Sequence, residues 1–243
     1  MWQWFHRLAS PPHFFRLAGC LQPWLAGVAL VLILFGTYAG LVLAPPDYQQ
    51  GDAFRIIYVH VPSAWLSLMG YTFMAVAAGI GLIWRMKLAH VMAHAAAPVG
   101  ATFTFLALAT GSLWGEPMWG SWWVWDARLT SELILLFLYL GYITLANAFD
   151  DHKRGDRASA ILALVGVINV PIIHYSVEWW HTLHQPATIT KFGAPSITWN
   201  MLWPLLVMAL GFTLFFAAVV LLRARAEILR REHKAGWVLE LKL

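Results

Sequence analysis

Six long apolar runs constrain the fold of this chain more than any other feature of its sequence. They lie at about 21–43, 64–84, 91–113, 129–149, 158–176 and 201–222. Each has close to the roughly 20 residues that a helix needs to cross the hydrocarbon core of a bilayer, which is about 30 Å thick. Because the runs take up most of the 243 residues, we expect a single domain over 1–243, an all-α integral membrane protein of six transmembrane helices.

The composition excludes several other classes of protein. Apolar residues make up 60% of the chain and charged residues 12%, a balance far from that of soluble domains. The net charge of +4 does not indicate nucleic acid, because basic residues in a membrane chain mainly signal topology. The single cysteine, Cys20, excludes an intrachain disulfide, and the absence of a CxxCH motif excludes a covalently attached c-type haem.

The distribution of Lys and Arg predicts the orientation in the membrane. Of these 16 residues, 13 lie before the first run, in the turns at 85–87 and 153–157, or after residue 222, and the other three are Arg55, Arg128 and Lys191. Basic residues mark the cytoplasmic side of a membrane protein. We therefore expect both termini to be cytoplasmic, and three outer loops at about 44–63, 114–128 and 177–200.

The second outer loop carries five tryptophans within twelve residues. It reads WGEPMWGSWWVWD from Trp114 to Asp126. Interfacial aromatic belts explain two or three tryptophans in a loop, but not five with interposed glycines and a terminal Asp. If 119–126 is helical, Trp119, Trp122 and Trp123 share one face, while Trp125 and Asp126 project elsewhere. That face is a flat apolar platform suited to a porphyrin, which also needs iron ligands and cations for its propionates.

Four of the ten histidines fall on the predicted outer side and are candidate iron ligands. His60 is the only histidine of its loop, and it stands just before Pro62, which we expect to start a helix. For a second ligand, spacing alone does not choose among His174, His181 and His184. The remaining histidines are expected on the inner side as solvated or headgroup-facing residues: His6, His13, His90, His94, His152 and His233.

Arg55 and Arg128 are rare cations on a side of the protein that otherwise lacks them. A guanidinium matches a carboxylate in bidentate geometry, so both are candidate partners for haem propionates. The alternative for Arg128 is an ion pair with Glu132, four residues along the same helix, or with Asp126.

The segment Trp119-Gly-Ser-Trp-Trp-Val-Trp-Asp126, followed by Ala-Arg-Leu-Thr-Ser, fits the WGxxWxWD signature. In this the chain resembles the haem-handling proteins of cytochrome c biogenesis, and among them the haem exporter protein C (CcmC) family of the system I maturation machinery. The resemblance covers essentially the whole chain. Larger synthetase-type relatives share the signature but need more helices and more histidines.

The resemblance implies that haem b is bound non-covalently at the periplasmic face of the bacterial inner membrane and delivered to a membrane-anchored haem chaperone. The resemblance implies that the two iron ligands are His60 and His184. Spacing alone does not select His184 over His174 and His181. The further partners that it implies are an ABC-type ATPase subunit, a second membrane subunit and a small single-helix subunit. The chain has no Walker A motif, so we expect neither ATP hydrolysis nor another enzymatic activity.

The residues expected to bind the cofactor are His60, His184, Trp114, Trp119, Gly120, Trp122, Trp123, Trp125, Asp126, Arg55 and Arg128. Two other functions compete with haem delivery. A b-type cytochrome requires pairs of histidines deep within facing helices. A permease requires polar residues at mid-membrane. Glu132, near the outer end of its run, is the main acidic residue within a predicted span. The sequence does not show how haem reaches the outer face.

Overall fold

The computed structural model describes residues 10–180, 182–184 and 193–241, and this part of the chain is helical and contains no strand. Six of its segments are long and apolar enough to cross a membrane, which confirms the predicted fold class. They are Pro11–Leu43, Asp52–Trp84, Lys87–Trp119, Ala127–Asn147, His152–Trp179 and Trp199–Arg231.

Three of the six membrane segments are single helices, and three are compound. The first is α2 (Pro11–Tyr38) continued by a π-helical turn (Ala39–Leu43), and a 3₁₀ turn (Asp52–Ile56) leads into α3 (Ile57–Trp84). The fifth divides into α6 (His152–Gly166) and α7 (Asn169–Trp179). The others are α4 (Lys87–Trp119), α5 (Ala127–Asn147) and α8 (Trp199–Arg231), followed by the short α9 (Gly236–Leu239).

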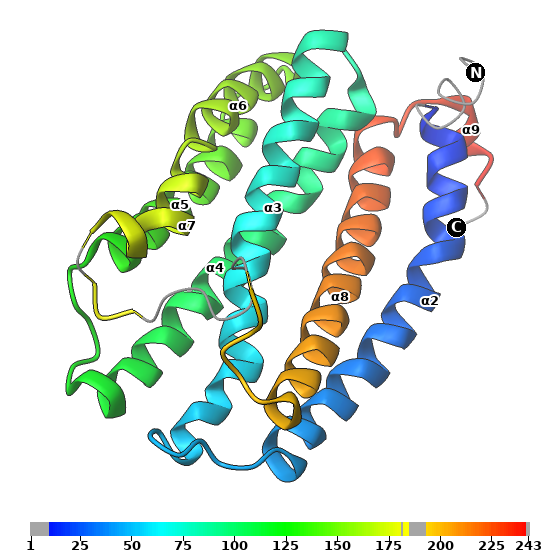
Figure 1. The fold of residues 1–243 in the computed structure, drawn as a ribbon. Helices are drawn as coiled ribbons and strands as arrows, with labels where there is room; N and C mark the ends of the chain where they lie inside the picture. Colours follow the sequence, from blue (N-terminus) through cyan, green and yellow to red (C-terminus); the bar gives the residue numbers. More distant parts are fainter. Residues whose placement is uncertain (1–9, 181, 185–192, 242–243) are drawn as a thin grey trace.

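The helices run up and down in one bundle, in which α3 packs along α4 and α2 packs along α8 (Figure 1). The start of α2, the α3–α4 and α5–α6 turns and α9 lie at one end, which we call the basic end because its turns carry Arg85, Lys87 and Lys153. The connections that follow α2 and α4 lie at the other end, which we call the loop end. The prediction that the loop end is periplasmic stays a prediction.

Several helices extend beyond the apolar runs. Because α3 begins at Ile57 rather than near residue 64, His60 lies in its second turn and Pro62 inside it, not at its start. A proline removes one backbone hydrogen bond, and membrane helices tolerate this where neighbouring groups compensate. Likewise α4 continues to Trp119, so Trp114 and Trp119 are helical residues rather than loop residues.

Small residues allow α3, α4 and α5 to approach one another closely. A Cβ added to Gly100 would lie 2.2 Å from the Tyr139 hydroxyl oxygen, and one added to Gly70 would lie 2.9 Å from the same atom. That hydroxyl donates to the backbone carbonyl of Ser67 at 2.8 Å. Close approach and interhelical hydrogen bonds hold helices together where lipid offers no hydrophobic driving force. The core therefore provides a rigid support for the loop end.

Candidate functional site

The tryptophan-rich segment is helical only as far as Trp119. Gly120 ends α4 in the left-handed conformation, with φ of +69°, and its N–H donates to the Glu116 carbonyl at 2.9 Å. Glycine is the usual residue at this position of a helix terminus. Residues 120–126 then lack helical structure until α5 begins at Ala127. Residues 119–126 therefore do not form the helix that would place Trp119, Trp122 and Trp123 on one face.

Gly120→Ala should destabilise the protein, because an L-residue in the left-handed region costs about 1–2 kcal/mol. We expect a lower Tm of the purified protein in detergent. Gly27→Ala is the matched control, since Gly27 lies inside α2 with nothing within 4 Å of an added Cβ. The control should be neutral or stabilising by about 0.5–1 kcal/mol. Equal Tm values for the two variants would contradict the structural role given to Gly120.

Two serine hydroxyls donate hydrogen bonds to the backbone of the segment, one from α4 and one from within the segment. Ser112 donates to the Trp122 carbonyl at 2.7 Å and Ser121 to the Trp123 carbonyl at 2.9 Å. Trp122 and Trp125 are 58% and 76% exposed, whereas the indole Nε1 of Trp123 is buried without a hydrogen-bond partner among the described residues. The segment thus offers exposed aromatic surface.

His60 reaches the site from the start of α3. The Thr110 hydroxyl donates to the Leu106 carbonyl at 2.6 Å, so its oxygen is an acceptor for the N–H at Nδ1 of His60, 3.0 Å away. This tautomer leaves the lone pair of Nε2 for another partner. Gly111 lies beside the ring, where an added Cβ would be 3.1 Å from Cε1 of His60. The imidazole is therefore fixed by α4 without being enclosed by it.

His184 reaches the site from the segment between α7 and α8. Its Nδ1 lies 3.1 Å from Oδ2 of Asp126, and its backbone N–H donates to the Thr182 hydroxyl at 2.9 Å. That hydroxyl donates to the same Asp126 oxygen at 2.6 Å. The other carboxylate oxygen accepts from the backbone N–H of Leu129 at 2.8 Å and caps α5. One carboxylate thus fixes a helix terminus and the orientation of a candidate iron ligand.

The electrostatics of this pair favour a neutral imidazole beside an ionised carboxylate. Burial acts to raise the pKa of Asp126, but hydrogen bonds from Thr182, Leu129 and His184 outweigh it and lower that pKa below its ordinary value. Burial lowers the pKa of His184, although Asp126 acts in the opposite direction. Metal-ligating histidines are usually neutral. Their Nδ1–H is bonded to a carboxylate or carbonyl, and Nε2 binds the metal.

Each histidine also packs against an indole of the segment. The ring of Trp114 lies 5.6 Å from that of His60, and the ring of Trp119 lies 4.9 Å from that of His184, both edge to face. Trp114 donates through Nε1 to the Gln50 side chain at 3.0 Å. His60 is near enough to His184 to interact with it electrostatically. All three predicted outer loops therefore contribute to one site.

The two arginines have different environments. Arg55 donates to the carbonyls of Gly40 and Ala44, both at 2.9 Å, and to Asp52 at 2.8 Å, so it holds the end of the first membrane segment to the start of the second. Arg128 is half-buried, and its guanidinium has no hydrogen bond or ion pair within the described part of the chain. Its proposed partners Glu132 and Asp126 attract it electrostatically, but neither makes a hydrogen bond or ion pair with it, so the N–H donors of Arg128 remain available to an anion.

Of the other two outer histidines, only His174 lies in the described part of the chain, and it makes no contact with His60 or His184 that the structure shows. His174 lies on α7 as an exposed residue whose ring packs against Tyr175, with centroids 4.7 Å apart. His181 lies outside the described residues. Sequence reasoning did not single out Thr110, Thr182 or Gln50. Of these three, only Thr182 could have been suspected from the sequence, because it stands two residues before the candidate ligand His184.

The family model described as Heme exporter protein C matches residues 4–239. The chain belongs to the haem exporter protein C family. Its relatives of that name include one from Escherichia coli K12, 54% identical over 243 residues that cover all of this chain and 98% of the relative. Another from Haemophilus influenzae is 51% identical, covering 98% and 97% of the two chains. A putative ccmC-like mitochondrial protein of cytochrome c biosynthesis from Marchantia polymorpha is 43% identical, covering 84% and 87%.

Membership of the haem exporter protein C family places this chain among the haem-handling membrane proteins of cytochrome c biogenesis. The residues of the site fit such a ligand. Two imidazoles are each held through Nδ1, the indoles of Trp122 and Trp125 are exposed, and the guanidinium of Arg128 makes no hydrogen bond or ion pair among the described residues. These groups match an iron, an apolar ring and a carboxylate edge.

Proposed function

We propose that this protein binds haem b non-covalently at the periplasmic face of the bacterial inner membrane and delivers it to a membrane-anchored haem chaperone. His60 and His184 are the iron ligands. The observation that carries the proposal is that each imidazole is held through Nδ1 beside the tryptophan-rich segment, His60 by Thr110 and His184 by Asp126. The tautomer with the proton on Nδ1 leaves the lone pair of Nε2 to a ligand. Family membership supports the same cargo.

In the proposed site each group has a separate task. The haem supplies the iron, the aromatic ring and the propionates that the protein recognises. Asp126 keeps His184 in one tautomer and orientation, and Thr110 does the same for His60. Trp114 and Trp119 limit the movement of the two imidazoles. Arg128 pairs with a propionate.

The exposed part of the segment suits delivery. Trp122 and Trp125 present aromatic surface outward, and His184 lies in a connecting segment rather than inside a membrane helix. A chaperone that bonds its own histidine to a haem vinyl group needs that edge of the haem open. A site at the loop end, with the propionates held by Arg128, leaves the opposite edge to the partner.

The further partners belong to the same proposal. The relatives are named as haem exporters, and the sequence contains no Walker A motif. We propose that an ABC-type ATPase subunit, a second membrane subunit and a small single-helix subunit assemble with this chain, and that the ATPase supplies the work of release. This division of labour leaves the chain itself with binding and presentation of haem.

The test is the haem content of the purified protein before and after mixing with the apo form of its haem chaperone. We expect stoichiometric haem, and its transfer to the chaperone on mixing. A b-type cytochrome keeps its haem under these conditions, and a permease holds none at rest. Either of these results would contradict haem delivery as the principal function.

The tryptophans of the segment should depend on aromatic surface more than on hydrogen bonding. We expect Phe to preserve more haem than Ala at Trp119, Trp122, Trp123 and Trp125, because no hydrogen bond from these indoles is found among the described residues. The readout is the haem absorbance per chain after purification. Trp24→Ala is the control, since Trp24 lies on α2 with 74% exposure. Equal damage from Phe and Ala at all four positions would indicate indole N–H contacts instead.

Arg128→Ala should weaken haem retention while both iron ligands stay in place. A charge-assisted hydrogen bond contributes about 1.5–3 kcal/mol, so we expect affinity to fall roughly 10- to 150-fold. Arg55→Ala should instead lower Tm, because it frees two backbone carbonyls and an Asp. The measurements are haem affinity, chaperone loading and Tm for each variant. Normal haem content and loading in the double variant would exclude propionate binding by either arginine.

A further inference from the structure

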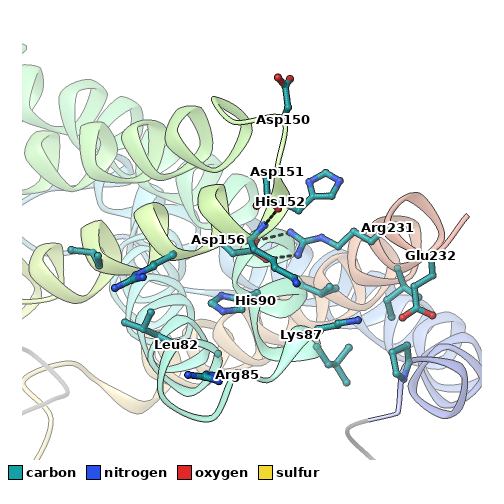
Figure 2. Close-up of a pocket in the computed structure, with 18 residues that line it drawn as sticks. Leu82, Arg85, Lys87, His90, Asp150, Asp151, His152, Asp156, Arg231 and Glu232 are labelled. Carbon is teal, nitrogen blue, oxygen red and sulfur yellow. Dashed lines mark hydrogen bonds and ion pairs between the residues drawn. The ribbon is translucent and has the colours of Figure 1, made fainter.

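A cavity lies at the basic end of the bundle, away from the candidate haem site. Its volume is about 1040 Å³, and it is bounded by the α3–α4 turn, the start of α6 and the end of α8 (Figure 2). Ligand pockets commonly measure about 300–1,000 Å³. The cavity is therefore large enough for a ligand of its own, and the proposed function gives it no role.

Four cations with no ion pair among the described residues line this cavity. Arg85 and Lys87 belong to the α3–α4 turn. Lys153 and Arg157 are four residues apart on α6 and so share one face of that helix. The two pairs come from different walls of the cavity.

Three of the four acidic side chains in the cavity are already engaged. Asp156 accepts two hydrogen bonds from Arg231, at 2.7 and 2.9 Å, and this ion pair joins α6 to α8 across the back of the cavity (Figure 2). Asp151 caps α6 by accepting from the backbone N–H of Lys153, and Glu232 accepts from the indole of Trp237. Asp150 is the fourth. Within the described part of the chain only Asp156 is in an ion pair, so four cations without one share the cavity with three carboxylates without one, and the lining carries a small excess of positive charge.

The start of α4 adds to this preference for an anion. Its N-cap residue, Met86, provides no side-chain hydrogen bond, and its first turn contains no acidic residue. The exposed N–H groups at a helix N-terminus carry partial positive charge, which acidic residues usually balance. Here Arg85 and Lys87 occupy the positions around the start of α4, so their positive charge adds to that of the helix N-terminus and no acidic residue of the first turn balances it.

The deeper lining is apolar, with Leu82, Leu88, Val91, Ile161 and Ile228. Ile161 is 50% exposed on α6, so the apolar lining continues onto the surface that faces lipid. His90 also lines the cavity, but its Nδ1 is buried and Gly81 packs against its ring. A second imidazole of the lining, that of His152 at the start of α6, is exposed. The cavity thus offers several cations beside an apolar lining.

We infer that this cavity binds an anionic phospholipid, with its phosphodiester between the two cation pairs and its acyl chains leaving over Leu82 and Ile161. Basic pockets between membrane helices commonly bind acidic lipid headgroups. The apolar lining distinguishes this ligand from free phosphate. The bound lipid would join the α3–α4 turn to α6 at the end of the bundle opposite the haem site.

The test is lipid binding to the purified protein by native mass spectrometry, with cardiolipin, phosphatidylglycerol or phosphatidylcholine added. We expect the two anionic lipids to bind more tightly than phosphatidylcholine. Removing one basic residue should weaken anionic binding about fivefold, so Lys153→Gln with Arg157→Gln should weaken it about 25-fold. The matched control is Arg154→Gln with Arg223→Gln, two exposed arginines outside the cavity whose loss changes the net charge equally.

Three results would overturn the inference. Phosphatidylcholine binding as tightly as the anionic lipids would show that the headgroup charge is not recognised. Equal loss in the test and control variants would show a dependence on net charge alone. Displacement of the lipid by millimolar inorganic phosphate, or by haem, with the same dependence on Lys153 and Arg157, would assign the cavity to that ligand instead.

Discussion

His60→Ala and His184→Ala are expected to lose more haem than any other single variant of this protein. Each removes a proposed bond between iron and an imidazole nitrogen, whereas loss of a group that only supports a ligand costs about 10- to 100-fold in metal affinity. The loss should therefore exceed that range. The measurement is haem per chain after purification, together with the rate of haem loss to a high-affinity apoprotein.

His174→Ala is the control for these variants. His174 is an exposed histidine of α7 whose ring packs on Tyr175, so its removal should leave haem content and transfer unchanged. Equal haem loss in His174→Ala and His184→Ala would contradict the assignment. A normal haem content in His60→Ala would likewise show that the first ligand lies elsewhere.

Asp126→Asn should lower haem affinity by about 10- to 100-fold with little change in Tm, because it removes the charge that supports His184. Asn remains a good N-cap residue, so the start of α5 should be preserved. Asp126→Ala removes both functions, and it should also lose about 1 kcal/mol of stability through the missing cap. Haem affinity by titration and Tm by thermal unfolding separate the two effects.

The positioning role of Asp126 also has a spectroscopic consequence. If the carboxylate orients His184, then Asp126→Asn should alter the haem absorption bands, because the imidazole ligand becomes less basic and less fixed. Thr182→Val should produce a smaller effect of the same kind, since Thr182 donates to the same carboxylate oxygen. An unchanged spectrum and affinity in Asp126→Asn would leave Asp126 with only its role as a helix cap.

The fold was predictable because the membrane limits the alternatives. A chain that crosses hydrocarbon must satisfy its backbone hydrogen bonds internally, so six long apolar runs predict six helices. The helix ends were less predictable. The position of Pro62 predicts the start of a helix there, yet α3 begins at Ile57. Similarly, α4 continues through Pro117 to Trp119. Polar and aromatic residues beyond the apolar runs remain helical because neighbouring segments pack on them.

The candidate site was predictable in its residues but not in its geometry. The density of tryptophan identified the segment, and His60 was isolated by its position in the chain. The contact between Asp126 and His184 joins residues 58 apart, which no local spacing shows. The conformation of Gly120 could not be recognised in advance, and it is what breaks the expected helical face.

The two arginines show the same limit. In the sequence Arg55 and Arg128 are both isolated cations on the predicted outer side, and an alternative ion pair is suggested only for Arg128. In the structure Arg55 binds backbone carbonyls that no side-chain pattern reveals, while Arg128 makes no hydrogen bond or ion pair among the described residues, although Glu132 and Asp126 attract it. Which cation is available to a propionate depends on where the end of the first membrane segment lies, and this is a property of tertiary packing.

The most direct measurement is the electron paramagnetic resonance spectrum of the ferric haem complex, recorded for the wild-type protein, His60→Ala and His184→Ala, with and without added imidazole. We predict a low-spin, six-coordinate iron in the wild type, loss of that signal in each variant, and its return when imidazole replaces the missing ligand. A low-spin signal that persists unchanged in both variants without imidazole would contradict iron ligation by His60 and His184.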